Sequence, residues 1–358
     1  MRSSPPTGGS VCPTLQQRRR PLSPTETSRR GCQRVGPGRG GFPGEAVHRA
    51  LTIPVRRRGI GRRPLRWQTG VMQRWILGAR PRTLPAAIVP VAVGTAVAAG
   101  SGVVWWRALL ALVVAVALQV GTNYSNDLAD GVRGTDGPDR TGPLRLVGSG
   151  MASPTEVRLA TGVAFAVAAT AGLSLAIAVT PWLLLVGAAS IAAGWFYTGG
   201  PRPYGYLGLG EVFVFVFFGL VATVGSAYVH AREITGLALL AGSAVGLLAV
   251  ALLVVNNLRD IPTDEKVGKR TLAVRIGERR TRWLYVAMAD GGLVLGSLCA
   301  LERPWAVLVL GGGVTAGPAV RAVLRGAGGA DLVPVLGRTA RTQMLAGALL
   351  AIGLVLSV

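Results

Sequence analysis

The sequence predicts an all-α membrane protein, a multi-span bundle of about nine transmembrane helices. Half of the 358 residues are hydrophobic and 15% are charged, and the mean hydropathy is +0.46, far from the average of soluble globular domains. From Met72 onward the chain contains nine apolar runs, each long enough to cross a hydrocarbon core about 30 Å thick. Backbone groups in lipid must be satisfied internally, and these runs lack strand alternation, so each run is expected to be a helix.

The chain begins with a segment of different composition, residues 1–71, rich in Arg, Pro, Gly and Ser. Fifteen arginines fall within the first 73 residues, against Glu26 and Glu45. A secretory signal requires an apolar run after its basic residues, and no such run follows these arginines. We interpret residues 1–71 as a disordered, dispensable extension and residues 72–358 as the transmembrane domain, with Met72 as the real start. The alternative is a basic arm that lies on anionic lipid.

The transmembrane domain opens with an interfacial stretch, Trp75–Pro85, whose Trp and Arg side chains are typical membrane anchors. The expected spans cover residues 84–100, 103–122, 157–179, 181–197, 208–229, 234–257, 283–301, 304–323 and 342–358. Only Thr180-Pro181 separates the third span from the fourth.

The distribution of Arg and Lys predicts the orientation of these spans. The loops after the even-numbered spans carry most of the basic residues, whereas the opposite side carries Arg107, Arg232 and Arg303. By the positive-inside rule, the amino terminus and the even-numbered loops are cytoplasmic and the carboxyl terminus is outside, in a plasma membrane. The same rule accounts for the net charge of +22 without nucleic-acid binding.

Two polar stretches end the second and sixth spans on this cytoplasmic side. In the first, Gln119, Asn123, Asp127 and Asp130 are spaced by four, four and three residues. In the second, Asn256, Asp260 and Asp264 are spaced by four. These spacings predict one polar helix face in each stretch. Two such faces pointed at each other would form an oxygen-rich cage suited to Mg²⁺ shared with a substrate diphosphate, and the alternative is a pair of solvated helix ends.

Basic side chains follow each acidic stretch, and we expect Arg145, Lys269 and Arg270 to bind diphosphate oxygens. The alternative for any of these residues is the positive-inside rule alone, which suffices for the arginines between 275 and 282. Tyr197 and Tyr204 flank a Gly- and Pro-rich turn and could be interface residues or site residues. Glu211 could be stabilised by the helix dipole near a helix start or could hydrogen-bond into the site, and Asp290 could be a site residue or a snorkelling one. Phe213, Phe215, Phe217 and Phe218 are expected to pack, or to line a channel for a carbocation. The three cysteines show no disulfide or zinc spacing.

The motif residues are similar to a known family. Asn126-Asp127-Leu128-Ala129-Asp130, the second acidic pair Asp260-x-x-x-Asp264 and the nine-span layout resemble the UbiA superfamily of intramembrane aromatic prenyltransferases. The strings Ala79–Pro85, Arg140–Arg145 and Asn256–Asp260 with Gly268–Leu272 resemble its members that use 1,4-dihydroxy-2-naphthoate in menaquinone synthesis. The resemblance covers residues 72–358 and none of the extension.

The resemblance implies a function and a set of site residues. Asp127, Asp130, Asp260 and Asp264 would hold Mg²⁺, which ionises a polyprenyl diphosphate, and Lys269 would join them in catalysis. The ring carbon that bears the carboxylate of dihydroxynaphthoate would attack the allylic cation and then lose CO₂, giving demethylmenaquinone. The expected partners are these two substrates and the lipid bilayer, with no nucleic acid and no obligate protein partner. The expected substrate-binding residues are Asn123, Asn126, Arg145, Tyr197, Asn256 and Arg270.

One position departs from the family pattern. The superfamily's first motif usually ends in a further Asp, but Gly134 stands there and the next acid is Asp136, which is a possible ligand. Two alternative functions remain open at this point. One is a related prenyltransferase that uses 4-hydroxybenzoate, homogentisate or haem, and the other is a secondary transporter. Transporter sites usually lie at the bilayer midplane, whereas these acids lie at span ends.

The composition of the extension generates a first prediction. Deletion of residues 2–71 should leave membrane insertion, folding and prenyl transfer intact, because this segment contains neither a span nor a motif. Insertion is measured by carbonate-resistant membrane association, and transfer by incorporation of a labelled prenyl group. A truncated protein that inserts normally but has lost transfer would instead favour the lipid-bound arm.

Overall fold

The computed structural model describes residues 70–134 and 145–358, and every regular element in these two ranges is a helix. The described residues belong to one compact unit, Arg66–Val358. Residues 1–69 of the predicted disordered extension lie outside the described residues, as does Asp136, whereas Val71 begins the first helix.

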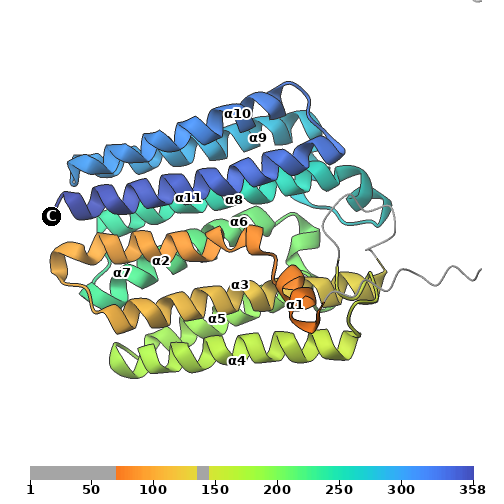
Figure 1. The fold of residues 1–358 in the computed structure, drawn as a ribbon, viewed down its shortest axis with the longest axis horizontal. Coiled ribbons are helices and arrows are strands. Elements are labelled where there is room, and N and C mark those ends of the chain that lie inside the picture. The colour runs from red at the N-terminus through yellow and green to blue at the C-terminus, as the bar shows by residue number, and fades with distance from the viewer. Residues whose placement is uncertain (1–69, 135–144) are drawn as a thin grey trace, which may run out of the picture. The chain divides into compact units, whose positions relative to one another are not determined.

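Each of the nine expected spans coincides with helical segments of the described chain, although fewer than nine are long enough to cross a membrane (Figure 1). Seven helical segments are long and apolar enough to cross a membrane, an eighth is a bent pair, and Trp182–Phe196 is a shorter apolar helix. The α-helices are α1 (Val71–Ala79), α2 (Pro85–Val97), α3 (Trp105–Arg133), α4 (Pro154–Ala178), α5 (Trp182–Phe196), α6 (Gly210–Val214), α7 (Ala222–Ala231), α8 (Gly236–Lys266), α9 (Leu272–Ser297), α10 (Gly313–Leu324) and α11 (Leu332–Leu356). The shorter 3₁₀ or π elements are η1 (Pro81–Thr83), η2 (Ala98–Ser101), η3 (Tyr204–Leu207), η4 (Phe215–Val221), η5 (Leu298–Leu301), η6 (Pro304–Gly312) and η7 (Gly329–Asp331).

Several helices extend further than their apolar runs indicated. Helix α8 continues to Lys266, so the second acidic stretch lies on a helix, as its spacing of four predicts. Helix α11 begins at Leu332, which places Arg338 and Arg341 on a helix instead of in the preceding loop. Hydropathy detects only the part of a helix that lies in lipid, and helices continue into the interface with charged side chains directed to water.

Local sequence signals explain where several helices begin and end. Ser153 and Glu156 form a capping box at the start of α4, with Pro154 at the first helical position. The hydroxyls of Thr235 and Thr271 accept hydrogen bonds from backbone N–H groups at the starts of α8 and α9. At the other end of α3, Gly134 adopts φ of +70°, which glycine tolerates without strain.

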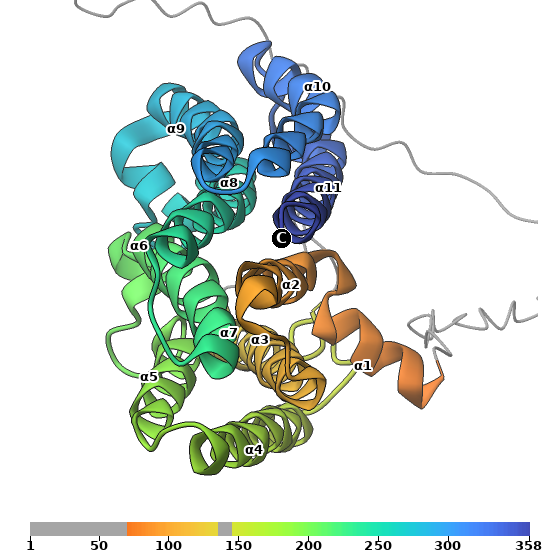
Figure 2. The same ribbon diagram turned by 90° about the vertical axis from the view of Figure 1, so that its left-hand side faces the viewer.

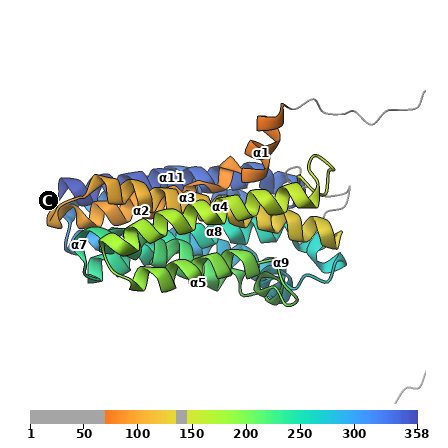
Figure 3. The same ribbon diagram turned by 90° about the horizontal axis from the view of Figure 1, so that it is seen from below.

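Most helices pack against partners that are distant in sequence as well as adjacent ones. Helix α3 lies beside α4, α2 beside α7 and α11, and α8 beside α9 and η4 (Figure 2). Helix α1 leaves the common direction of the others (Figure 3), at an angle of 56° to α2. The bend falls at Arg80, which adopts φ of +54°. A positive φ is costly for a residue other than glycine and typically persists only where the surroundings impose it.

The middle of the fifth span is a π-helix, η4, which packs closely against α8. A Cβ atom on Gly219 of η4 would lie 2.5 Å from Gly246 Cα and 2.8 Å from the Gly242 carbonyl oxygen. The two backbones therefore touch at this crossing. Short π segments inside α-helices occur frequently at functional sites.

This crossing generates a second prediction. Gly219→Ala should force η4 away from α8 and lower the free energy of unfolding by about 1–3 kcal/mol, the usual cost of overpacking. Gly162→Ala is the matched control, because a Cβ on Gly162 of α4 has no atom within 4 Å. Unfolding in mixed detergent micelles measures both variants. Equal stability of the two variants would contradict the close backbone contact.

Candidate active site

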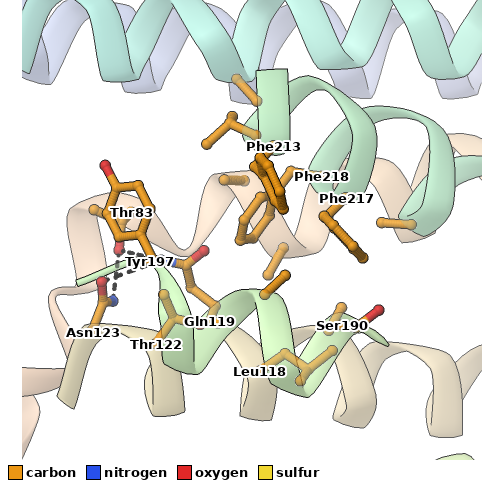
Figure 4. A pocket seen from close by; sticks show the side chains of 18 of the residues that line it. Thr83, Leu118, Gln119, Thr122, Asn123, Ser190, Tyr197, Phe213, Phe217 and Phe218 are labelled. Atoms are coloured by element: carbon orange, nitrogen blue, oxygen red, sulfur yellow. Dashed lines mark hydrogen bonds between the residues drawn. The ribbon is translucent and has the colours of Figure 1, made fainter. Parts of the chain in front are cut away.

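A large cavity runs through the described bundle between α2, α3, α5, the fifth span and α8. Its volume is about 780 Å³. Figure 4 shows the amides of Gln119 and Asn123 and the phenol of Tyr197 in one part of it, and the rings of Phe213, Phe217 and Phe218 in another. Asp130, Arg145, Asp260 and Lys269 also line it. The cavity therefore combines charged walls with an apolar, aromatic interior.

Helix α3 presents Gln119, Asn123, Asn126 and Asp130 to this cavity. At 3.6 residues per turn, Asn126 lies about 20° around the helix from Gln119, whereas Asp127 lies about 80° away. Asn126 therefore lies on the polar helix face at the place where the spacing of four predicted Asp127. The remainder of the expected face is present.

Asp127 does not line the cavity and is 1% exposed. Its two carboxylate oxygens accept hydrogen bonds from the backbone N–H groups of Leu146 and Val147, at 2.8 and 2.9 Å. Arg145 immediately precedes these residues. Through these two hydrogen bonds, Asp127 links the segment that carries Arg145 to helix α3.

Asp130 contacts side chains from two other segments. Arg145 Nη2 lies 3.3 Å from Asp130 Oδ2, and the hydroxyl of Tyr206 donates to Oδ1 at 2.9 Å. Both Asp130 and Arg145 are more than nine-tenths buried. A buried carboxylate of this kind requires a cation and hydrogen-bond donors to remain charged.

The facing acids on α8 are also paired with basic side chains. Arg259 Nε and Nη2 donate to the two oxygens of Asp260, each at 2.6 Å, and Nη2 also reaches Asn256 Oδ1 at 2.9 Å. Asp264 does not line the cavity; its Oδ1 lies 3.7 Å from the Lys269 ammonium group. Lys269 does line the cavity and lies over the ring of Tyr206, 5.3 Å from its centroid.

A network of amide and hydroxyl groups fixes the bend between α1 and α2 against α3. The Nδ2 group of Asn123 donates to the Ala79 carbonyl oxygen at 2.8 Å and to Thr83 Oγ1 at 2.9 Å. The Nε2 group of Gln119 donates to Thr83 Oγ1 at 3.1 Å (Figure 4). The bend also brings Arg80 and Arg82 to the cavity wall.

Aromatic side chains continue the cavity beyond the amides. The rings of Tyr204 and Phe213 stack at 3.8 Å between centroids, and those of Phe213 and Phe217 lie 6.0 Å apart. Burial raises the pKa of both Tyr197 and Tyr204, and for Tyr197 the nearby Glu211 raises it further. Both phenols are therefore protonated at neutral pH and can donate hydrogen bonds.

Most of the side chains predicted from the sequence meet at this cavity. Those that line it are Asn123, Asn126, Asp130, Arg145, Tyr197, Asn256, Asp260 and Lys269. Asp127, Asp264 and Arg270 do not line it, and Arg270 is exposed. Asp290 lies on α9 away from the cavity and is exposed. The roles assigned to all of these residues remain predictions.

Sequence reasoning missed several residues of the site. Arg259 lines the cavity and stands between Asn256 and Asp260 in the acidic motif, but the positive-inside rule already accounted for it. Tyr206 does not line the cavity but donates to Asp130, and it had no spacing signal, because it belongs to the short helix η3, whose path only the tertiary structure shows. Arg80 and Arg82 line the cavity, whereas the sequence indicated only membrane anchors and a string that resembles a family, and helix periodicity stops at Pro81.

Within the described residues, no three His, Cys, Asp or Glu side chains are close enough to hold a metal ion by themselves. The donors that line the cavity are nevertheless of the kind that Mg²⁺ prefers. Asp130 and Asp260 supply one carboxylate from each of two helices, and Asn126 and Asn256 lie one turn before them. Mg²⁺ is commonly bound by one or two carboxylates, with waters and substrate phosphates completing its shell. Asp130 and Asp260 therefore fit an ion that is shared with a diphosphate.

Comparison with known proteins adds to this geometry. Residues 87–331 match the UbiA prenyltransferase family. The 1,4-dihydroxy-2-naphthoate octaprenyltransferase of Mycobacterium tuberculosis is 51% identical over 280 residues, covering 78% of this chain and 95% of that protein. The Escherichia coli protein of the same name is 38% identical over 301 residues, covering 80% of this chain and 96% of that protein.

Solved structures share the fold at low sequence identity. A UbiA homolog from Aeropyrum pernix superposes with a TM-score of 0.60 at 17% identity, covering 75% of this chain and 97% of that one. A UbiA homolog from Archaeoglobus fulgidus, bound to GPP and Mg²⁺, gives a TM-score of 0.54 at 15% identity, covering 77% and 99%. The helical arrangement is therefore common to these proteins.

The contacts of Asp127 generate a third prediction. Asp127→Ala should lower the free energy of unfolding by about 1–3 kcal/mol, because it leaves the N–H groups of Leu146 and Val147 without their acceptor. Asp331→Ala is the control, since Asp331 is exposed and its side chain makes no capping hydrogen bond. It should change stability by less than about 0.5 kcal/mol. If Asp127→Ala is as stable as this control in a micelle unfolding titration, Asp127 does not hold the segment.

Proposed function

Because the chain belongs to the UbiA prenyltransferase family, we propose that it transfers a polyprenyl chain from its diphosphate to 1,4-dihydroxy-2-naphthoate. The observation that carries the proposal is the cavity, which has paired acids and bases at one part of its wall and an aromatic interior elsewhere. This division matches a substrate with an anionic head and a hydrocarbon tail. The naphthoate specificity is supported by the relatives at 51% and 38% identity, whose names specify that acceptor.

The charged part of the wall suits the diphosphate. Arg145, Arg259 and Lys269 can donate to phosphate oxygens, the two arginines in bidentate fashion. Asp130 and Asp260 would hold Mg²⁺, which supplies positive charge that stabilises the departing diphosphate. These side chains converge from α3, α8 and the segments that follow them, so their positions are set before substrate binds.

The reaction requires one bond to break in each substrate. The carbon–oxygen bond of the allylic diphosphate breaks with its electron pair going to diphosphate, and the ring carbon that bears the carboxylate forms the new carbon–carbon bond. The carbon–carboxylate bond then breaks, CO₂ leaves, and its electron pair restores the aromatic ring. Phe213, Phe217 and Phe218 exclude water from the allylic cation and can face it with their π electrons.

The catalytic residues are placed on the cytoplasmic side in this proposal. Arg133, Arg145, Arg202, Arg259, Lys266 and Lys269 are at the same ends of their segments as Asp130 and Asp260, whereas the opposite ends carry Arg107, Arg232 and Arg303. The positive-inside rule supports this orientation. The site then opens toward the compartment that holds soluble phosphorylated precursors and Mg²⁺.

The proposal predicts acceptor specificity. Membranes that contain the protein, supplied with a labelled polyprenyl diphosphate and Mg²⁺, should prenylate 1,4-dihydroxy-2-naphthoate and not 4-hydroxybenzoate, homogentisate or haem. One CO₂ should be released per prenyl group transferred, and chelation of the metal should abolish product. Chromatography of labelled lipids and trapping of CO₂ measure the two products.

Asp260→Asn is the matched control, because it preserves side-chain volume but removes a hard anionic ligand from the cavity. Its turnover should fall by about two orders of magnitude or more, with insertion unchanged. Product formed from 4-hydroxybenzoate with its carboxylate retained would assign the protein to a different acceptor. Solute uptake without prenylation of any acceptor would exclude the proposed reaction.

A further inference from the structure

Glu211 is a buried carboxylate to which the proposed reaction gives no role. It lies at the start of α6 and is 7% exposed. Its Oε1 accepts a hydrogen bond from Asn257 Nδ2 at 3.0 Å, and its Oε2 is buried and has no hydrogen-bond partner. No salt bridge to Glu211 exists within residues 70–134 and 145–358, where its neighbours are Asn257 and Tyr197.

The burial of the Glu211 carboxylate with so few partners does not stabilise the fold. An ionised carboxylate in an apolar bundle costs free energy unless a cation or several donors compensate it, and among the described residues Glu211 receives one side-chain donor, Asn257, besides its own backbone N–H. Buried polar atoms without partners are few in native proteins, and local conflicts of this kind are expected mainly at functional sites. Glu211 is therefore a candidate for a role in ligand recognition.

Asn257 connects Glu211 to the cavity. It is 6% exposed and lines the cavity wall, while its Nδ2 group is directed to Glu211. A carboxylate can only accept from a neutral amide, so Glu211 fixes which end of the Asn257 amide faces it. Asn257 Oδ1 is then left as a hydrogen-bond acceptor for a molecule in the cavity, and the described residues provide no donor to it.

The adjacent residue on α8 has the opposite environment. Asn256 contacts Arg259, which is paired with Asp260, and so belongs to the charged wall that suits a diphosphate. Glu211, Asn257 and Tyr197 offer no cation, and the carboxylate of Glu211 disfavours an anion beside it. An uncharged hydroxyl group that donates to Asn257 Oδ1 is the ligand chemistry that this part of the wall fits.

We propose that Glu211 is a positioning residue that orients Asn257 so that Asn257 Oδ1 accepts a hydrogen bond from a ring hydroxyl of the acceptor. This inference rests on the proposed prenyl transfer to a dihydroxylated aromatic ring. The single-residue separation of Asn256 and Asn257 places the hydroxyl site next to the diphosphate site, so the bound ring lies beside the allylic carbon. A site built to receive a hydroxyl rejects analogues that lack it more strongly than an apolar pocket can.

Kinetics of three variants test the role of Glu211. Glu211→Leu and Asn257→Leu should each raise the acceptor KM by about tenfold or more, because the hydrogen bond to the hydroxyl is lost or misaligned. The KM for the polyprenyl diphosphate should change by less than about threefold, since Arg145, Arg259 and Lys269 are untouched. Glu211→Gln should restore an acceptor KM near that of the parent protein, because its amide oxygen still accepts from Asn257 Nδ2. Glu265→Leu, an exposed position on α8, is the control.

A second arm measures binding, first to the parent protein and then to Asn257→Leu. Binding of 1,4-dihydroxy-2-naphthoate and of its two monomethyl ethers is measured by equilibrium dialysis, without oxygen so that the hydroquinone is not oxidised. One ether should bind about tenfold more weakly than the parent compound, and this difference should disappear in Asn257→Leu. Ethers that both bind as tightly as the parent compound would overturn the inference, as would a Glu211→Leu variant that raises both KM values equally.

The two arms separate this inference from the proposed function. Acceptor binding that depends on Asn257, without any prenyl transfer, would refute the proposed reaction and support the hydroxyl site. Normal transfer with an unchanged acceptor KM in Glu211→Leu and Asn257→Leu would refute the hydroxyl site alone. A parent protein that neither binds the acceptor nor transfers a prenyl group would overturn both.

Discussion

The pairing of buried carboxylates with donors from other segments is the constraint on which this site depends. Asp127 and Asp130 are buried and Asp260 is half-buried, near the ends of α3 and α8, which are long and apolar enough to cross a bilayer, and an unpaired charge there would be expensive. Asp127 pairs with two backbone N–H groups, Asp130 with Arg145 and Tyr206, and Asp260 with Arg259. The partners of Asp127 and Asp130 come from other parts of the chain, so these contacts also bring the segments of the site together, whereas Arg259 directly precedes Asp260 on α8.

The two aspartates of the first acidic stretch therefore have different roles. Asp127 holds the backbone that carries Arg145, and Asp130, three residues later, receives the side chain of that arginine. Loss of the first contact would move the second. The positions of Arg145 and Asp130 at the cavity wall thus depend on Asp127, which does not line the cavity. Residues that bind a ligand commonly depend on supporting groups of this kind.

Much of the fold was predictable from the sequence, because a lipid environment permits few alternatives. Runs such as 103–122 and 234–257 are helical by necessity once they cross the bilayer. The site was predictable only in part. A spacing of four could not separate Asp127 from Asn126, since adjacent residues differ by about 100° and the rotation of α3 is set by its neighbours. The π-helix η4 and the bend at Arg80 also lacked a sequence signal, because both are imposed by packing against other helices.

Helix α5 is shorter than α3, α8 and the fifth span, which also wall the cavity. Its 15 residues, Trp182–Phe196, rise only about 22 Å, whereas the hydrocarbon core of a typical bilayer measures about 30 Å. The side chains of Trp182, Leu185 and Phe196 on this helix are exposed. A helix shorter than the hydrocarbon core is expected to thin the bilayer around it. Gly187, Ser190 and Gly194 of the same helix line the cavity, so the thickness of the host membrane acts directly on one wall of the chamber that receives the prenyl chain.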